Sequence, residues 1–347
     1  MTDLDQRISS TLRERAEGAV DTNRLTARAV AGGRARRRRR RAGAGVALGL
    51  TAALGAGVIA GLPSTGPAPQ LAAPAVVAVA PPRADGIPGA AARPDLIGSD
   101  PQVLHFGADP ARVRYLGWEV ARGVESVQID VGSGRAVTVD LARSSGALRQ
   151  RPVEGLPGEL GNLAAEAAFD GRAVRLGPDA RPVLIRHWHP ASGLFARAVV
   201  SEGTAAELLV AADLLRWDQA RRCAAPLRLT ALPPGATLAG CRVDLGAFPQ
   251  ALSATMTLTR TGERWMSVGL QYAQGVAGGR TEGNRTIGGR AAYLYPKGDQ
   301  LELLGFPKAH LIADFGWPTV GFTEADATAL LAGAQVADDL TRPETWQ

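Results

Sequence analysis

Residues 34 to 62 have the sequence RARRRRRRAGAGVALGLTAALGAGVIAGL, in which a block of arginines precedes 21 residues without a charge. At about 1.5 Å per helical residue, the uncharged stretch would form a helix roughly 30 Å long. That length matches the hydrocarbon core of a bilayer, which is also about 30 Å thick. The sequence therefore predicts a single transmembrane helix over residues 42–62.

The arginines predict how this helix is oriented. Positively charged flanks stay on the cytoplasmic side of a membrane. We therefore expect a cell-membrane protein with residues 1–41 in the cytoplasm and the C-terminal domain extracellular. The residues expected to determine this topology are Arg34, Arg36, Arg37, Arg38, Arg39, Arg40 and Arg41.

A cleaved export signal is the alternative explanation of the apolar stretch. Alanine and glycine make up 13 of its 21 residues, so it is only weakly hydrophobic. However, 41 residues precede it, and it exceeds the roughly 7–15 apolar residues of a signal peptide. We expect a retained anchor, and the cleaved segment stays open as the alternative.

The distribution of charge argues against a nucleic-acid-binding protein. The whole chain has a formal charge of +6. Residues 1–41 contain twelve arginines and five acidic residues, a net charge of +7, which leaves −1 for the rest of the chain. A basic block beside an apolar span attracts anionic lipid. We therefore expect membrane lipid as a partner and no specific nucleic acid.

The N-terminal tail contains a narrow amphipathic pattern. Leu4, Ile8 and Leu12 recur at about one helical turn, and polar residues occupy the other positions. A stripe this thin cannot form a domain alone, so the helix needs a partner or the membrane surface, or it stays partly disordered. Of these, we expect a helix that binds a cytoplasmic partner.

The remainder divides into a linker and a folded part. Eight prolines lie within residues 63–94, which predicts a semi-rigid linker. Residues 95–347 are numerous enough to bury a large core, as one domain or as halves covering 95–245 and 246–347.

Strand patterns dominate residues 95–347, and the predicted fold class is α+β with a mostly antiparallel sheet and two packed helices. Residues 124–130 and 136–141 alternate around Gly132-Ser133-Gly134, which predicts a hairpin. Further strands are expected over 182–188, 194–200, 256–258, 266–272, 291–295 and 309–315. The two helices are expected over 204–217 and over 324–337, with Thr323 as a cap of the second.

The order of these elements suggests a weak internal repeat. A Gly-Arg-Ala triplet begins a strand at Gly171 and again at Gly289, and in each case a second strand and a leucine-containing helix follow. The equal order and similar spacing favour a duplicated strand-then-helix unit, although chance similarity in an Ala- and Gly-rich chain stays open.

Cys223 and Cys241 are the two cysteines of the chain. The compartment outside a cell is oxidising and permits disulfides. The prolines and glycine between these residues can turn the chain back, so we predict a structural disulfide, with free buried thiols as the alternative.

Few residues suggest chemistry. His187 and His189 flank Trp188 and could face one side of a strand as metal ligands, but no third ligand is identifiable, and two solvent-facing histidines are the plainer interpretation. The chain lacks a Gly-x-Ser-x-Gly elbow, a phosphate loop and a His-Glu-x-x-His helix. We therefore expect no enzyme activity, no metal and no cofactor.

The sequence Leu12-Arg13-Glu14-Arg15-Ala16-Glu17, the arginine block and the span together resemble actinobacterial anti-sigma-factor-like single-pass membrane proteins. The predicted exterior elements resemble, more loosely, RseB-like and lipoprotein-carrier-like periplasmic domains. The zinc-binding motif common in such tails is missing, since residues 1–41 contain neither histidine nor cysteine.

The resemblance implies a non-enzymatic single-pass membrane protein. Its exterior domain would sense or bind an envelope ligand, and its tail would act on a sigma factor or another cytoplasmic partner. A membrane-tethered envelope-binding or scaffold module without a signalling role is the alternative.

Overall fold

The computed structural model describes residues 79–346, apart from residues 154–155, 157, 180, 262–263, 276–279 and 317–320. The described residues belong to one compact unit that extends from Pro74 to Gln347. The predicted tail, arginine block and membrane span lie outside the described residues. Within the described part, no helix is both long and apolar enough to cross a bilayer.

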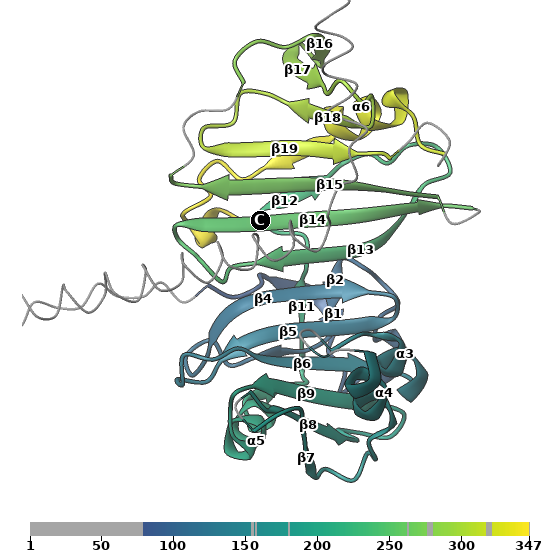
Figure 1. The fold of residues 1–347 in the computed structure, drawn as a ribbon. Helices are drawn as coiled ribbons and strands as arrows, with labels where there is room; N and C mark the ends of the chain where they lie inside the picture. Colours follow the sequence, from purple (N-terminus) through teal and green to yellow (C-terminus); the bar gives the residue numbers. More distant parts are fainter. Residues whose placement is uncertain are drawn as a thin grey trace, which may run out of the picture. The chain divides into compact units, whose positions relative to one another are not determined.

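An antiparallel sheet of 13 strands forms the centre of the unit and extends from β16 at one edge to β7 at the other (Figure 1). Its strand pairs are antiparallel, which confirms the predicted α+β class with a mostly antiparallel sheet. From edge to edge the strands are β16 (Arg285–Ile287), β17 (Arg290–Leu294), β18 (Gln300–Leu303), β19 (Ala309–Asp314), β15 (Arg264–Ala273), β14 (Ala251–Arg260), β13 (Thr237–Asp244), β4 (Arg114–Ala121), β5 (Val124–Asp130), β6 (Val137–Ala142), β9 (Phe195–Ser201), β8 (Val183–Trp188) and β7 (Ala173–Leu176).

Two sets of elements follow the same order along the chain. In the first set, β4, β5 and β6 are followed by β7, β8, β9 and helix α5 (Ala205–Asp213). In the second set, β13, β14 and β15 are followed by β16, β17, β18, β19 and helix α6 (Glu324–Ala332). The sets meet where β4 pairs with β13. This order contains the predicted strand-then-helix pattern twice. Its second occurrence begins at β13, before the predicted boundary at residue 246.

Helices α5 and α6 begin as the sequence predicts but end earlier. Thr204 caps α5 and Thr323 caps α6, and in each case an acidic side chain three residues later completes a capping box. The predicted ends at residues 217 and 337 are wrong, because a short strand follows each helix. These strands are β10 (Leu215–Arg216), which pairs with β3 (Gly107–Ala108), and β20 (Ala334–Val336), which pairs with β12 (Leu227–Leu229).

The folded part also begins before residue 95. Strand β1 (Arg83–Pro88) falls within the predicted linker and pairs with β11 (Gln219–Arg222), which in turn pairs with β2 (Val103–Leu104). Val79 is buried as well. Two short 3-10 helices complete the unit, at Pro94–Leu96 and Pro343–Thr345. Proline is tolerated in an edge strand such as β1, so the proline content alone overestimates the length of the linker.

The large sheet has two chemically different faces. We call the side that carries α5 and α6 the core face, because their buried Leu208 and Leu330 join the main apolar cluster there. We call the other side the open face. Successive residues of a strand point to opposite faces. In β14, Leu252, Ala254, Met256 and Leu258 are buried on the core face, and the residues between them are half-buried on the open face.

Two helices that the sequence does not predict lie on the open face over β6, β8 and β9. Leu148 of α3 (Ser145–Gln150) packs with Val124 and Ala142, and Ala164 of α4 (Gly158–Glu166) packs with Ile185 and neighbouring valines. The expectation of two packed helices is therefore too low. Both additional helices are short and contain glycine, so packing rather than helix propensity stabilises them.

The central strands β4 and β13 approach each other closely at Gly117. A Cβ atom added at Gly117 would lie 2.7 Å from the carbonyl oxygen of Val243 on β13. The apolar pattern of the sequence predicts neither strand. A glycine interrupts the apolar alternation of each, at Gly117 and at Gly240.

Candidate functional site

A line of polar side chains crosses the open face of the sheet. We call it the polar row, and each of its members is the register partner of the next. Register partners in a sheet point to the same side, so six neighbouring strands contribute to this one line. From β13 to β8 the polar row consists of Arg242, Glu119, Ser126, Asp140, Arg197 and His187.

The centre of the polar row is a buried ion pair. Nε and Nη2 of Arg197 lie 3.0 and 2.6 Å from Oδ2 of Asp140, and both residues are almost fully buried. Nη1 of Arg197 donates to the backbone carbonyls of Leu148 and Arg151, and the hydroxyl of Ser126 donates to the other oxygen of Asp140. Leu148 lies in α3 and Arg151 directly follows this helix. The hydrogen bonds from Arg197 to their carbonyls therefore attach α3 to the sheet.

Toward the middle of the sheet the polar row becomes accessible to solvent. Nη2 of Arg151 donates to Glu119 at 2.7 Å, and Nη1 of Arg242 lies 3.6 Å from the same oxygen. A hollow of about 10 Å³ lies beside these residues, and its lining includes Gln128 and Asp244. This volume holds about one water molecule. The polar row therefore presents mixed charges at this point, without a cavity for a ligand.

The sequence predicts that His187 faces solvent. His187, at the other end of the polar row, is buried instead. It is 2 % exposed, its ring lies 4.8 Å from that of Phe169, and its Nδ1 forms no hydrogen bond with a described residue. Burial and the charge of Arg197 lower the pKa of His187 to about 4. His189 lies against Phe195 and hydrogen-bonds to the carbonyl of Leu194.

These histidines do not form a metal site. In the part of the chain that the structure describes, no group of three or more His, Cys, Asp or Glu side chains could hold a metal ion.

An open depression of about 420 Å³ lies where β14 and β19 begin and β15 ends. We call it the groove. Its polar lining comes from one end of the open face, where the polar side chains of four neighbouring strands are register partners, and alanine, leucine and tyrosine side chains supply the rest. The lining residues include Asp244, Ser253, Gln271, His310, Ala247 and Tyr272. This volume lies in the range of small-molecule sites, and the mixed lining would accept a ligand with both polar and apolar surfaces.

A buried carboxylate holds one wall of the groove in place. Nδ1 of His310 lies 2.6 Å from Oε1 of Glu302, and the hydroxyl of Tyr295 donates to Oε2 of Glu302 at 2.8 Å. Glu302 is buried, and burial together with this carboxylate raises the pKa of Tyr295. Arg280 stacks on the rings of Tyr293 and Tyr295. The imidazole is therefore fixed through Nδ1, and Nε2 forms no hydrogen bond with the described residues.

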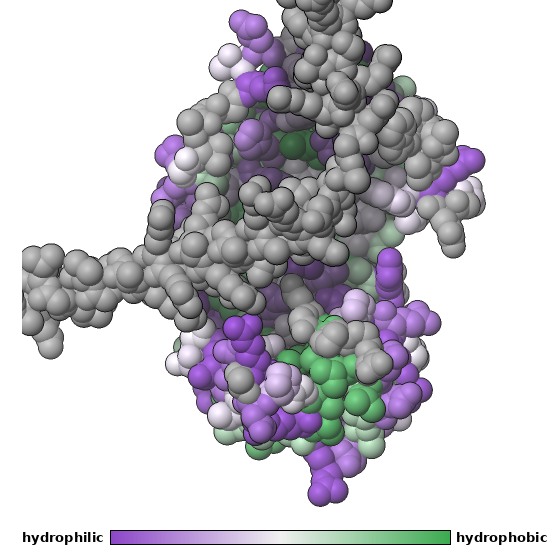
Figure 2. All heavy atoms as spheres, in the orientation of Figure 1, coloured by the Kyte–Doolittle hydropathy of each residue, from purple (hydrophilic) through white to green (hydrophobic). Residues whose placement is uncertain are grey.

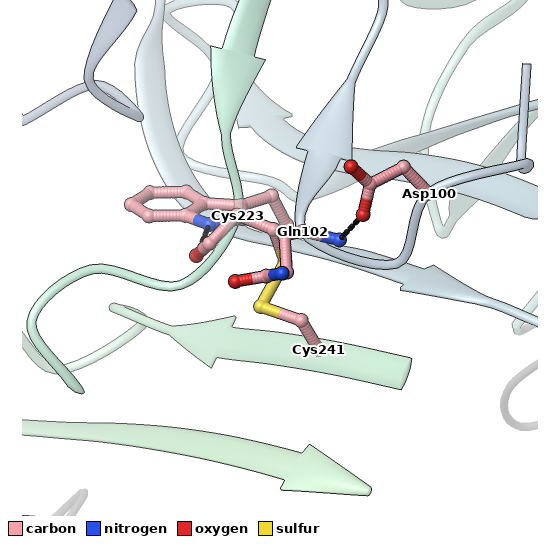
Figure 3. The surroundings of a disulfide bond; sticks show 5 residues. Asp100, Gln102, Cys223 and Cys241 are labelled. Carbon is pink, nitrogen blue, oxygen red and sulfur yellow. Dashed lines mark hydrogen bonds between the residues drawn. A yellow bond between two sulfur atoms is a disulfide. The ribbon is translucent and has the colours of Figure 1, made fainter. Parts of the chain in front are cut away.

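The disulfide that the sequence predicts is present. Cys223, directly after β11, is bonded to Cys241 in β13, with 6.1 Å between their Cα atoms (Figure 3). Both residues are buried, the indole nitrogen of Trp118 donates to the carbonyl of Cys223, and the amide of Cys223 donates to the carbonyl of Gln102. The bond therefore connects the small β1–β11–β2 sheet to the centre of the large sheet.

The remaining predicted site residues lie outside the described residues. These are the tail residues Leu4, Ile8 and Leu12 and the arginines at positions 34 and 36–41. The sequence predicts neither the polar row nor the groove, since neither forms a local motif. The available signal was a single charged residue inside an apolar strand, as at Asp140 and Arg197.

A second surface feature lies over α4. Figure 2 shows apolar side chains gathered over this helix and the strands beside it. Leu163 of α4 is 55 % exposed and Val174 of β7 is 36 % exposed, while Ile185 below them is buried. The apolar patch lies beside the free edge of β7.

Comparisons with known proteins give little guidance. No family model and no curated protein matches this sequence. A solved structure described as MucB in complex with MucA(peri) aligns with 71 % of this chain and 97 % of its own, at 13 % identity and a TM-score of 0.21. This similarity is weak, and it carries no argument about the fold of this chain or about what it binds.

Proposed function

We propose that this chain is a single-pass membrane protein without enzyme activity, anchored by residues 42–62. Its C-terminal unit would lie outside the membrane and sense or bind envelope material, and residues 1–41 would form a cytoplasmic regulatory tail. In this proposal Leu4, Ile8 and Leu12 contact a cytoplasmic protein, for which a sigma factor is the first candidate.

The observation that carries this proposal is the buried disulfide between Cys223 and Cys241. Disulfides persist in oxidising compartments and are rare in the reducing cytosol. The arginine block independently favours the same topology, because it would hold residues 1–41 in the cytoplasm and direct the remainder outward. A sequence pattern and a covalent feature of the folded unit thus favour one orientation.

A binding role is supported by the open face. The groove is open to solvent and has both polar and apolar lining residues, and buried Glu302 fixes the imidazole of His310 at its wall. A fixed side chain at an accessible surface loses little conformational entropy when it contacts a ligand. We therefore place envelope recognition on the open face of the second set of strands.

Topology mapping in the native membrane tests the proposal. One reporter is fused before Arg34 and one after residue 100, and the oxidation state of Cys223 and Cys241 is read by thiol alkylation before and after reduction. We expect a cytoplasmic first reporter, an exterior second reporter and cysteines that react only after reduction. A mature chain that lacks its N-terminus and is free in the medium would overturn the membrane-anchored proposal.

The tail is tested separately with Leu4, Ile8 and Leu12 changed together to alanine. We expect this variant to lose a partner that the intact tail retains in pull-downs, and to change the same transcripts as deletion of residues 1–30. The matched control changes Gln6, Ser9 and Ser10 to alanine. If neither variant nor the deletion alters transcripts, the chain is a tethered binding module without a signalling role.

A further inference from the structure

The open face of β14 consists of hydroxyl-bearing side chains. Buried core-face residues alternate along β14 with half-buried residues of the open face. From position 253 to position 259, each of these open-face residues is a serine or a threonine. These open-face residues are Ser253, Thr255, Thr257 and Thr259. At about 3.4 Å per residue, they form a line roughly 20 Å long.

Neighbouring strands extend this line into a surface. Thr257 is the register partner of Ser267, and Ser253 is the register partner of Gln271. Thr255 is the register partner of Gly269, which has no side chain to cover the hydroxyl of Thr255. We call the surface formed by Ser253, Thr255, Thr257, Thr259, Ser267 and Gln271 the hydroxyl platform.

The hydroxyl platform has few hydrogen-bond partners of its own. Oγ1 of Thr259 lies 3.4 Å from Oγ1 of Thr237 on β13. The other platform side chains form no side-chain hydrogen bond with the described residues. Each hydroxyl can donate one hydrogen bond and accept two. The platform therefore presents unused donors and acceptors. Its own side chains carry no formal charge, and the charged Arg242 and Asp244 of β13 are the register partners of Thr255 and Ser253.

Distinct features lie at its two ends. The groove lies at one end, and Ser253 and Gln271 belong to both surfaces. At the other end Trp265, the register partner of Thr259, is 46 % exposed. Most large apolar side chains of this sheet are buried, whereas this indole is accessible beside a polar surface. In the first set of strands, α3 and α4 cover the same face.

We propose that the hydroxyl platform binds a polysaccharide chain, which lies along β14 from the groove to Trp265. This inference rests on the proposed exterior location of the unit, and it names the ligand class. Sugar hydroxyls both donate and accept hydrogen bonds, as the platform side chains do. The apolar face of a sugar ring packs against an aromatic side chain, for which Trp265 is placed. A phosphate-rich ligand would instead require clustered arginine or lysine, whereas the single Arg242 beside Thr255 is accompanied by the opposite charge of Asp244 beside Ser253.

The test uses the full chain in detergent micelles and two probes. The first is peptidoglycan sacculi stripped of protein, measured by co-sedimentation, and the second is a soluble hexamer of N-acetylglucosamine, measured by calorimetry. One variant carries Trp265→Ala. A second carries Thr255→Val and Thr257→Val, which remove two hydroxyls and keep the branched side-chain shape suited to a strand. The matched control is Thr286→Val, at an exposed threonine of edge strand β16.

We expect the wild type and the control to bind sacculi or the hexamer. We expect the Trp265→Ala variant and the variant with Thr255→Val and Thr257→Val each to bind at least tenfold more weakly at an unchanged unfolding temperature. Equal binding by all four proteins would place the glycan site elsewhere and overturn the proposal. A folded wild type that retains neither probe would also overturn it. The topology mapping is unaffected by either result, so failure of this inference is distinguishable from failure of the proposed function.

Discussion

Asp140 and Arg197 are register partners on β6 and β9, and two guanidinium nitrogens of Arg197 lie 3.0 and 2.6 Å from a single oxygen of Asp140. Both residues are almost completely buried. Removing one partner of such a pair leaves the other charge buried without compensation. We expect Asp140→Asn to lower the free energy of unfolding by about 3–5 kcal/mol, measured by urea denaturation.

The exposed ion pair between Arg342 and Glu344 provides the control. Its members are more than half exposed, and exposed pairs contribute little. Glu344→Gln should therefore leave the unfolding midpoint unchanged. If Asp140→Asn shifts the midpoint no more than Glu344→Gln does, then the buried pair does not stabilise the contact between α3 and the sheet.

Buried His187 makes stability depend on pH. Its pKa is lowered to about 4 by burial and by Arg197, whereas an unfolded histidine titrates near 6.5. Between these values the unfolded chain binds a proton that the folded chain does not bind. The contribution of His187 to the free energy of unfolding is therefore fully present above about pH 6.5. It decreases by about 3 kcal/mol as the pH falls toward 4.

Replacing His187 with leucine should remove this contribution. Unfolding free energies measured between pH 7 and pH 4.5 should then fall less steeply for His187→Leu than for the wild type. The control is His189→Gln, which retains His187 and should follow the wild-type curve. Parallel curves for the wild type and His187→Leu would show that His187 takes up its proton equally in the folded and unfolded states.

Local sequence patterns predicted those elements whose stability is local. The β5–β6 hairpin was predicted because its strands alternate and because Gly132-Ser133-Gly134 suits a turn. The carboxylate of Asp130 accepts the amide hydrogens of Gly132 and Gly134 there. The starts of α5 and α6 were likewise recognisable from Thr204 and Thr323, which cap their own helices.

Features that depend on distant residues could not be predicted from local patterns. Glu119, Asp140 and Arg197 come together only through strand register, and no spacing in the sequence encodes that register. The ends of α5 and α6 depend on β3 and β12, since these strands pair with the residues that follow each helix. Tertiary pairing therefore overrides local helix propensity at these ends.

The disulfide should contribute directly to stability. Cys223 and Cys241 are 18 positions apart, and a bond closing a loop of this size stabilises a fold by roughly 3 kcal/mol in the chain-entropy model. We expect a reducing agent to lower the unfolding temperature of the wild type. A variant with both cysteines changed to alanine should unfold earlier and should not respond to the reducing agent. A response of that variant would attribute the effect to something other than this bond.

Two glycines should respond in opposite directions to replacement by alanine. At Gly117 in β4, the added Cβ atom would lie 2.7 Å from the carbonyl oxygen of Val243, where the two sets of strands meet. Because that oxygen belongs to the backbone of β13, the clash requires the strands to separate. We expect Gly117→Ala to lower the free energy of unfolding by about 1–3 kcal/mol.

Gly161 in α4 is the matched comparison, since a Cβ atom added there would meet no atom within 4 Å. Alanine is preferred to glycine within a helix by about 1 kcal/mol. Gly161→Ala should therefore raise the unfolding midpoint in denaturant, while Gly117→Ala lowers it. A shift of both midpoints in the same direction would contradict either the close approach of β4 to β13 or the helical conformation at Gly161. Amide hydrogen exchange on the two variants identifies which, because strand separation would expose the amides of β4 and β13.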